Sequence, residues 1–174
     1  MTQKNLWTPW RMEHVLGQTK KISGCLFEPP GDNSSNAEFL LLYRDNMRLV
    51  LLNRFPYANG HLLIAPVRHV ADITDLTVEE NYAIMDMLQK SCSILRRHLH
   101  PDGFNIGLNL GEIAGAGIAD HLHFHVVPRW QGDHNFMTIT ADIRTIPEHI
   151  NNTFSQLEPD FQQLLPKGGS NGIR

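Results

Sequence analysis

Residues 121–127 read HLHFHVV, a stretch in which histidine alternates with apolar residues. On a β-strand, alternation at period two places His121, His123 and His125 on one face and the apolar side chains on the other. Packing of the apolar face fixes the strand, so the imidazoles would form a row with a spacing of about 6.5 to 7 Å. The stretch therefore predicts a strand that holds three histidines along one face.

A row of imidazoles has a defined chemistry. Adjacent rings disfavour each other's protonation, and partial burial lowers a histidine pKa further, so the middle ring, His123, should be neutral near pH 7. A neutral imidazole is a nucleophile toward phosphorus, and neighbouring hydrogen-bond donors can stabilise a transferring phosphate. The pattern favours nucleotidyl transfer through His123. A metal-binding strand and an exposed histidine-rich stretch without a function are the alternatives.

Composition restricts the class of protein. A chain of 174 residues with 41% hydrophobic residues is long enough for one globular domain with a sizeable core. The net charge is -3, and no basic run exceeds a pair of Lys or Arg, so neither DNA nor RNA is an expected partner. No apolar run is long enough to span a membrane, and the N-terminal residues lack a secretory hydrophobic region. A cytoplasmic protein is expected, with Cys25 and Cys92 reduced and Cys92 in the core.

Short apolar runs predict the strands of an antiparallel sheet. Three of them, residues 39–44, 48–53 and 60–66, are separated by turn sequences, among them Asn59-Gly60. Residues 104–110 supply a fourth strand, and the histidine stretch is the fifth.

The helical pattern is concentrated in one segment. Thr77 and Glu80 form a capping-box start, apolar residues follow at helical spacing, and Pro101 stops the helix after Leu99. Residues 147–157 and 159–165 are expected to form short helices. One long helix among five strands indicates an α+β fold with an antiparallel five-stranded sheet rather than a parallel α/β fold.

The histidine stretch and its surroundings resemble the histidine triad (HIT) superfamily. HLHFHVV matches the pattern His-x-His-x-His-x-x, NRFPYANGHLLIAPVRHVADITDLTVEE is similar to the family's nucleotide-binding strand pair, and LNLGEIAGAGIADHLHFHVVPRW is similar to its phosphate loop. The resemblance covers about residues 40–140. It suggests a single domain with an N-terminal tether over 1–36, a HIT core over 37–140 and a C-terminal extension over 141–174. WTPWRM, GAGIADHLH and GDHNFM look most like bacterial diadenosine tetraphosphate phosphorylases.

The resemblance implies a mechanism without a cofactor in the chemistry. His123 would attack the α-phosphorus of a dinucleoside polyphosphate and form a nucleotidyl-imidazole intermediate, which inorganic phosphate or water would resolve. His125 would hydrogen-bond the phosphoryl group or the bridging oxygen, and His121 would orient its neighbour. A nucleoside phosphoramidase, another nucleotide hydrolase, or a zinc-stabilised nucleotide-binding module with little turnover are the alternatives.

Substrate-binding residues are expected around the triad. The loop before it would let backbone N–H groups approach phosphate, or it is a plain connection; its candidate residues are Asn109, Gly111, Gly115 and Gly117. Many relatives carry Gln where this chain has Gly117. Arg129 is a candidate phosphate partner and Asn135 a candidate contact to the second nucleotide, unless both belong to a solvated loop.

The strand pair before the long helix carries further candidates. In relatives the residue that matches Asn53 lies by the ribose, although Asn53 could equally cap a turn. Leu51, Phe55 and Ile64 would line a base pocket or belong to the core, and His61 has a structural interpretation.

The resemblance also implies a structural metal site. Relatives hold zinc with a C-x-x-C segment, the His of P-x-R-H and the first triad His; the matching residues here are Cys25, Glu28, His69 and His121. Glu in place of the second Cys leaves one S, one O and two N donors, a set that zinc accepts, unless the site has been lost. Family members are usually homodimers joined through the long helix and a sheet edge, so a homodimer is expected.

Overall fold

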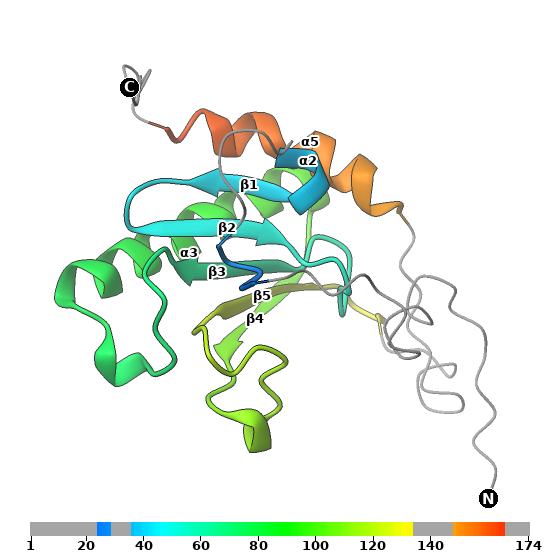
Figure 1. Ribbon diagram of the computed structural model, residues 1–174. Helices are drawn as coiled ribbons and strands as arrows, with labels where there is room; N and C mark the ends of the chain where they lie inside the picture. Colours follow the sequence, from blue (N-terminus) through cyan, green and yellow to red (C-terminus); the bar gives the residue numbers. More distant parts are fainter. Residues whose placement is uncertain (1–23, 29–35, 134–147, 166–174) are drawn as a thin grey trace, which may run out of the picture.

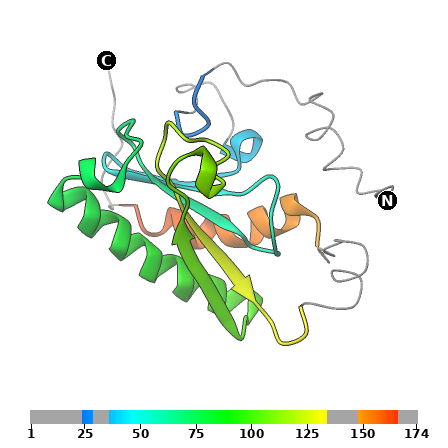
Figure 2. The same cartoon turned by 90° about the horizontal axis from the view of Figure 1, so that it is seen from below.

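The computed structural model describes residues 24–28, 36–133 and 148–165. A five-stranded antiparallel sheet has the strand order β1-β2-β3-β5-β4, and two long helices cover one of its faces (Figures 1 and 2). The strands are β1 (Leu41–Arg44), β2 (Arg48–Leu52), β3 (Leu62–Pro66), β4 (Gly103–Leu108) and β5 (Phe124–Arg129). The helices are α2 (Asn36–Phe39), α3 (Val78–Leu99) and α5 (Ile150–Gln162), with the short 3₁₀ helices η1 (Ile73–Asp75) and η2 (Glu112–Ala114). The α+β class and the antiparallel sheet are confirmed.

The α3 helix begins and ends as its sequence predicts. The Thr77 side chain accepts a hydrogen bond from the Glu80 N–H, and the Glu80 carboxylate accepts one from the Thr77 N–H, so the capping box is present. His100 follows the helix in the left-handed region, at φ 47°, and precedes Pro101, which cannot continue the helix. Described residues contain no helix that is both long and apolar enough to cross a membrane.

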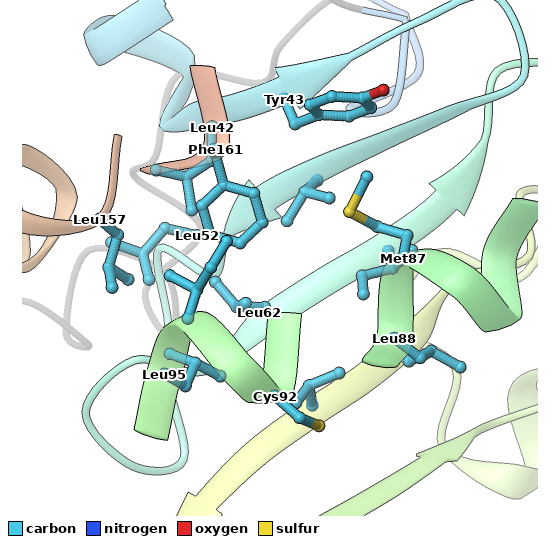
Figure 3. Close-up of a cluster of buried hydrophobic side chains, with 14 of the residues drawn as sticks. Leu42, Tyr43, Leu52, Leu62, Met87, Leu88, Cys92, Leu95, Leu157 and Phe161 are labelled. Atoms are coloured by element: carbon cyan, nitrogen blue, oxygen red, sulfur yellow. The ribbon is translucent and has the colours of Figure 1, made fainter. Parts of the chain in front are cut away.

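The main hydrophobic core lies between the sheet and the helices α3 and α5. Figure 3 shows side chains of this core converging from both helices and from the sheet, including Leu62 from β3, Leu95 from α3 and Leu157 from α5. Cys92 is buried in the same core, as its place in the helical pattern predicted. Burial of these apolar surfaces is the principal stabilising contribution to the fold.

Two boundaries differ from those the sequence predicts. The fifth strand begins at Phe124 rather than His121, because β3 ends at Pro66, which has no N–H for further pairing. Leu122 instead donates its N–H to the carbonyl of Val70, at 2.7 Å, outside the ladder. At the C-terminal end, α5 runs through Pro159, so one helix replaces the two expected on either side of it.

Candidate functional site

The candidate site lies on the sheet face that the two long helices do not cover. Strand register determines this: Leu62 pairs with Val126, and both point into the main core, while the next pair, Leu63 and His125, points to the other face. Residues 24–28 lie over that face, in front of β3 in Figure 1. The triad therefore has the main core behind it and the 24–28 segment against it.

The middle histidine, His123, has its reactive nitrogen defined by a backbone contact. Its Nδ1 lies 2.9 Å from the carbonyl oxygen of His121, and a carbonyl only accepts, so Nδ1 carries the proton and donates. The Nε2 lone pair is therefore available for attack. Burial lowers the pKa of His123, whose residue is only 5% exposed, which keeps the ring neutral at pH 7.

The third histidine, His125, receives its orientation from His61. The backbone N–H of Tyr57 donates to His61 Nδ1 at 3.1 Å, so the proton of the neutral His61 ring is on Nε2. That Nε2 lies 2.9 Å from His125 Nδ1, which must accept, and the proton of His125 is consequently on its own Nε2. His125 thus presents an N–H donor, beside the lone pair that His123 presents.

Burial strongly favours the neutral state of the His61 and His125 rings. Burial, followed by the charges of His125 and His123, lowers the pKa of His61 to about 3. Burial, followed by the charge of His123, lowers the pKa of His125 to about 4. The tautomers derived from the contacts are therefore those of neutral rings at pH 7.

Sequence reasoning missed the contact that His61 makes with the triad. His61 has no exposed surface and lies immediately before β3, 64 positions before its partner His125. The signal that could have found it is the pairing of the strand after Gly60 with the triad strand, which brings the residue before β3 beside the triad. The structural interpretation of His61 is therefore incomplete, because His61 also contacts His125 of the triad.

The ring of the first histidine, His121, makes its polar contacts with residues outside the triad. Its Nε2 donates to the carbonyl of Pro66 at 2.9 Å, which leaves a lone pair on Nδ1, 3.2 Å from the Cys25 sulfur. Its ring also meets the edge of the His69 ring, with centroids 4.8 Å apart, and His69 Nδ1 lies 2.9 Å from a Glu28 carboxylate oxygen. His121 therefore lies among other side chains that could hold a metal ion.

The structure brings together the four residues that the resemblance implies as metal ligands. One donor atom from each of Cys25, Glu28, His69 and His121 lies within 4.8 Å of the others. One sulfur, one carboxylate oxygen and two imidazole nitrogens suit tetrahedral zinc, and the His121 tautomer offers a lone pair to such an ion. Burial raises the pKa of the Cys25 thiol, so ion binding would have to displace its proton.

The loop before the triad is closed by its own contacts. The Asn109 side-chain amide donates to the carbonyl of Gly115 at 3.2 Å, and the loop turns at Gly111 and Gly115, whose φ angles are 78° and 89°. Such φ values favour glycine. At Gly117 an added Cβ would meet nothing within 4 Å, so steric crowding does not require glycine there.

Three other residues expected to bind substrate are Asn53, Arg129 and Asn135. The first two have hydrogen-bond partners within the protein. Asn53 caps the turn by accepting the Phe55 N–H at 3.0 Å, while its side-chain nitrogen lies 3.2 Å from His61 Nδ1. The Arg129 guanidinium donates to the carboxylate of Asp133 and, at 2.7 Å, to Asn105. Arg129 is the last residue of β5, and its partners lie on the neighbouring strand β4 and in the residues after β5. Asn135 lies outside the described residues.

The base-pocket interpretation of the apolar strand residues is corrected in part. Ile64 packs in the main core under α3 and α5, on the opposite face from the triad, so it cannot line a pocket beside it. Leu51 lies on the triad face, in a second cluster with Phe27, Leu49 and Leu63.

Comparison with known proteins gives a consistent family. The HIT domain family model matches residues 34–132, more than half of the chain. The chain is 38% identical over 156 residues to the AP-4-A phosphorylase of Mycobacterium tuberculosis, covering 86% of this chain and 80% of that protein. It is 28% identical over 127 residues to the bis(5'-adenosyl)-triphosphatase of Dictyostelium discoideum, covering 72% and 83%.

A solved structure agrees with these sequence matches. The crystal structure of a Zn-bound histidine triad family protein from Mycobacterium smegmatis superposes with a TM-score of 0.57 at 31% identity, over 72% of this chain and 85% of that chain. Sequence motif, sheet topology and site geometry thus agree, and the chain belongs to the HIT domain family.

Proposed function

We propose that this protein is a nucleotidyl-transfer enzyme that cleaves dinucleoside polyphosphates such as diadenosine tetraphosphate through His123. The observation that carries the proposal is the pair of opposite tautomers: His123 offers a lone pair at Nε2, and His125 offers a proton at Nε2. Their ring centroids are 5.0 Å apart, so both nitrogens can serve one phosphoryl group. The relatives named AP-4-A phosphorylase and bis(5'-adenosyl)-triphosphatase support the choice of substrate class.

The first step is attack of His123 Nε2 on the α-phosphorus. An N–P bond forms, the P–O bond to the leaving nucleotide breaks, and the electron pair stays on the leaving oxygen. The Nε2–H of His125 stabilises that oxygen by hydrogen bonding, and the His121 carbonyl stabilises the positive charge that develops on the His123 ring through Nδ1–H.

The second step releases the nucleotide from His123. An oxygen of inorganic phosphate or water attacks the phosphorus, the N–P bond breaks to restore the His123 lone pair, and the proton of the attacking group passes to solvent. Backbone N–H groups of the loop at Gly111 and Gly117 would hold phosphate oxygens, whereas the Gly115 N–H already donates to the carbonyl of Glu112 at 2.9 Å. Contacts of Asn53, Asn109, Arg129 and Asn135 with substrate stay predictions.

Product analysis tests the proposal. Purified protein is incubated with diadenosine tetraphosphate, with and without inorganic phosphate, beside His123→Ala. Phosphate-dependent ATP and ADP would establish a phosphorylase, and phosphate-independent ATP and AMP a hydrolase. Cleavage confined to adenosine phosphoramidates would favour a phosphoramidase. Nucleotide binding without His123-dependent cleavage would contradict the proposal and favour a binding module.

We also propose that Cys25, Glu28, His69 and His121 hold a structural zinc ion. The ion would tie residues 24–28 to the sheet and to the loop after β3, and it would supply no chemistry to the reaction. Support comes from the clustering of the four donors. Purification without added metal should yield about one zinc per chain, lost in a Cys25→Ala/Glu28→Ala variant; metal-free preparations throughout would contradict the site.

We also propose that the protein is a homodimer, as the family resemblance implies. β4 is an edge strand, Ile106 on it is 49% exposed, and Tyr82 and Met85 expose apolar surface on α3. Pairing of edge strands across a two-fold axis would cover such a surface. Light scattering tests this, and a monomer at working concentration would contradict it. The cytoplasmic location and the division into tether, core and extension stay predictions.

A further inference from the structure

A short segment outside the family match contacts the triad directly. Residues 24–28 precede the matched region 34–132, yet the side chain of Phe27 has no exposed surface. Its ring centroid lies 5.0 Å from that of His121 and 4.9 Å from that of His123. The aromatic ring therefore lies against both the proposed metal ligand and the nucleophile.

The contact with Phe27 restricts the ring of His123. The donor role of Nδ1 toward the His121 carbonyl exists in one orientation of the imidazole, and a half-turn about its Cβ–Cγ bond would remove it. The Phe27 side chain is itself packed in the buried cluster that contains Leu49, Leu63 and Ala65, so it has little room to move. A fixed ring packed at 4.9 Å opposes that half-turn.

The position of Phe27 depends on the residues on either side of it. Cys25 reaches His121 through its sulfur, Glu28 reaches His69 through its carboxylate, and the Glu28 N–H donates to the Cys25 carbonyl at 3.0 Å. These side chains are the two metal-ligand candidates of the segment. A ligand that binds both the Cys25 and the Glu28 side chain would therefore also fix the backbone position of Phe27 between them.

We propose that Phe27 is a positioning residue that holds the His123 imidazole in its attacking orientation, and that metal binding at Cys25, Glu28, His69 and His121 strengthens this hold through the 24–28 turn. The contact comes from residues 24–28, which precede the matched region 34–132. The kinetic part of the proposal rests on the proposed function, whereas the orientation of His123 can be observed without substrate.

The experiment compares Phe27→Leu with Leu49→Val, which alters packing in the same cluster without a ring contact to the triad. Single-turnover formation of the His123 adduct from diadenosine tetraphosphate should slow about ten- to a hundredfold in Phe27→Leu, with KM nearly unchanged, and stay within about twofold in Leu49→Val. A raised KM with an unchanged rate of adduct formation would overturn the proposal and make Phe27 a substrate contact.

Ring ¹⁵N NMR gives the second readout, which needs no turnover. Zinc-loaded wild type should show one His123 tautomer with the proton on Nδ1, and Phe27→Leu should show a mixture. In chelator-treated protein, added zinc should sharpen the wild-type signal but leave the mixture in Phe27→Leu, although both bind equal zinc. A single tautomer in every sample would overturn the positioning role, and an equal response to zinc in both proteins would overturn the coupling.

The two readouts also separate this proposal from the proposed function. If wild-type protein forms no adduct but the tautomer responds as expected, the reaction assignment fails and the positioning role stands. If the adduct forms normally in Phe27→Leu and the His123 tautomer is unchanged, the positioning role fails and the reaction assignment stands.

Discussion

The two faces of the sheet are built on different principles although they share the same strands. One face meets α3 and α5 and is packed almost entirely with apolar side chains. The other carries imidazoles, each held by a hydrogen bond, beside a smaller apolar cluster. The step from the Leu62–Val126 pair to the Leu63–His125 pair changes one environment into the other. A single residue of register thus separates the main apolar core from the candidate site.

The largest effect is expected from a substitution on the helix-covered face. Leu157 on α5 is fully buried in the main core, so Leu157→Ala should lower the free energy of unfolding by about 2 to 5 kcal/mol. The catalytic rate per folded molecule should be unchanged, because the triad lies on the other face. Urea unfolding and single-turnover kinetics test this, and a large fall in the rate would show that the faces are coupled.

Acid should act through the site face. The pKa of His61 is about 3 in the folded protein against about 6.5 in an unfolded chain, so the unfolded state binds more protons between these values. Stability is therefore full above about pH 6.5 and falls as pH decreases, by roughly 3 kcal/mol from His61 at pH 4.

Urea unfolding between pH 7 and pH 4 measures this loss. His61→Gln is the matched variant, because glutamine does not titrate in that range. Its stability should depend less steeply on pH than that of wild type, and identical slopes would contradict the assignment of the loss to His61.

The donor function of His61 predicts a catalytic effect of intermediate size. His61→Ala leaves His125 Nδ1 without its donor, so His125 loses its single tautomer, and kcat should fall about ten- to a hundredfold. His61→Gln carries an amide N–H and should recover part of the loss. Equal activity of the two variants would show that burial rather than proton donation is the contribution of His61.

The smallest effect is expected at a polar residue on the apolar face. Ser91 on α3 is fully buried, and within the described residues its hydroxyl has no hydrogen-bond partner. Ser91→Ala should raise the free energy of unfolding by about 1 kcal/mol, because it removes an unsatisfied polar group and favours the helix. Activity should stay at the wild-type level, and a lower unfolding midpoint would indicate a partner for the hydroxyl.

The helix-covered face was the easier of the two to predict. Capping residues and helical periodicity defined α3, and turn sequences separated the strands, since these signals are local. The start of β5 was misplaced because it depends on Pro66, more than fifty residues away in sequence. His61 was underestimated for the same reason: its contact with His125 comes from strand pairing and not from spacing. The four metal-ligand candidates were located only because of the family resemblance.

The three protons that define the chemistry of the site are fixed by the main chain. The carbonyl of His121 acts on His123, the carbonyl of Pro66 on His121, and the N–H of Tyr57, through His61, on His125. Main-chain groups persist whichever side chain a position carries. Residues around the site other than His61 and Phe27 can therefore vary, and any leaving-group preference with them, without changing which nitrogen of each ring carries the proton.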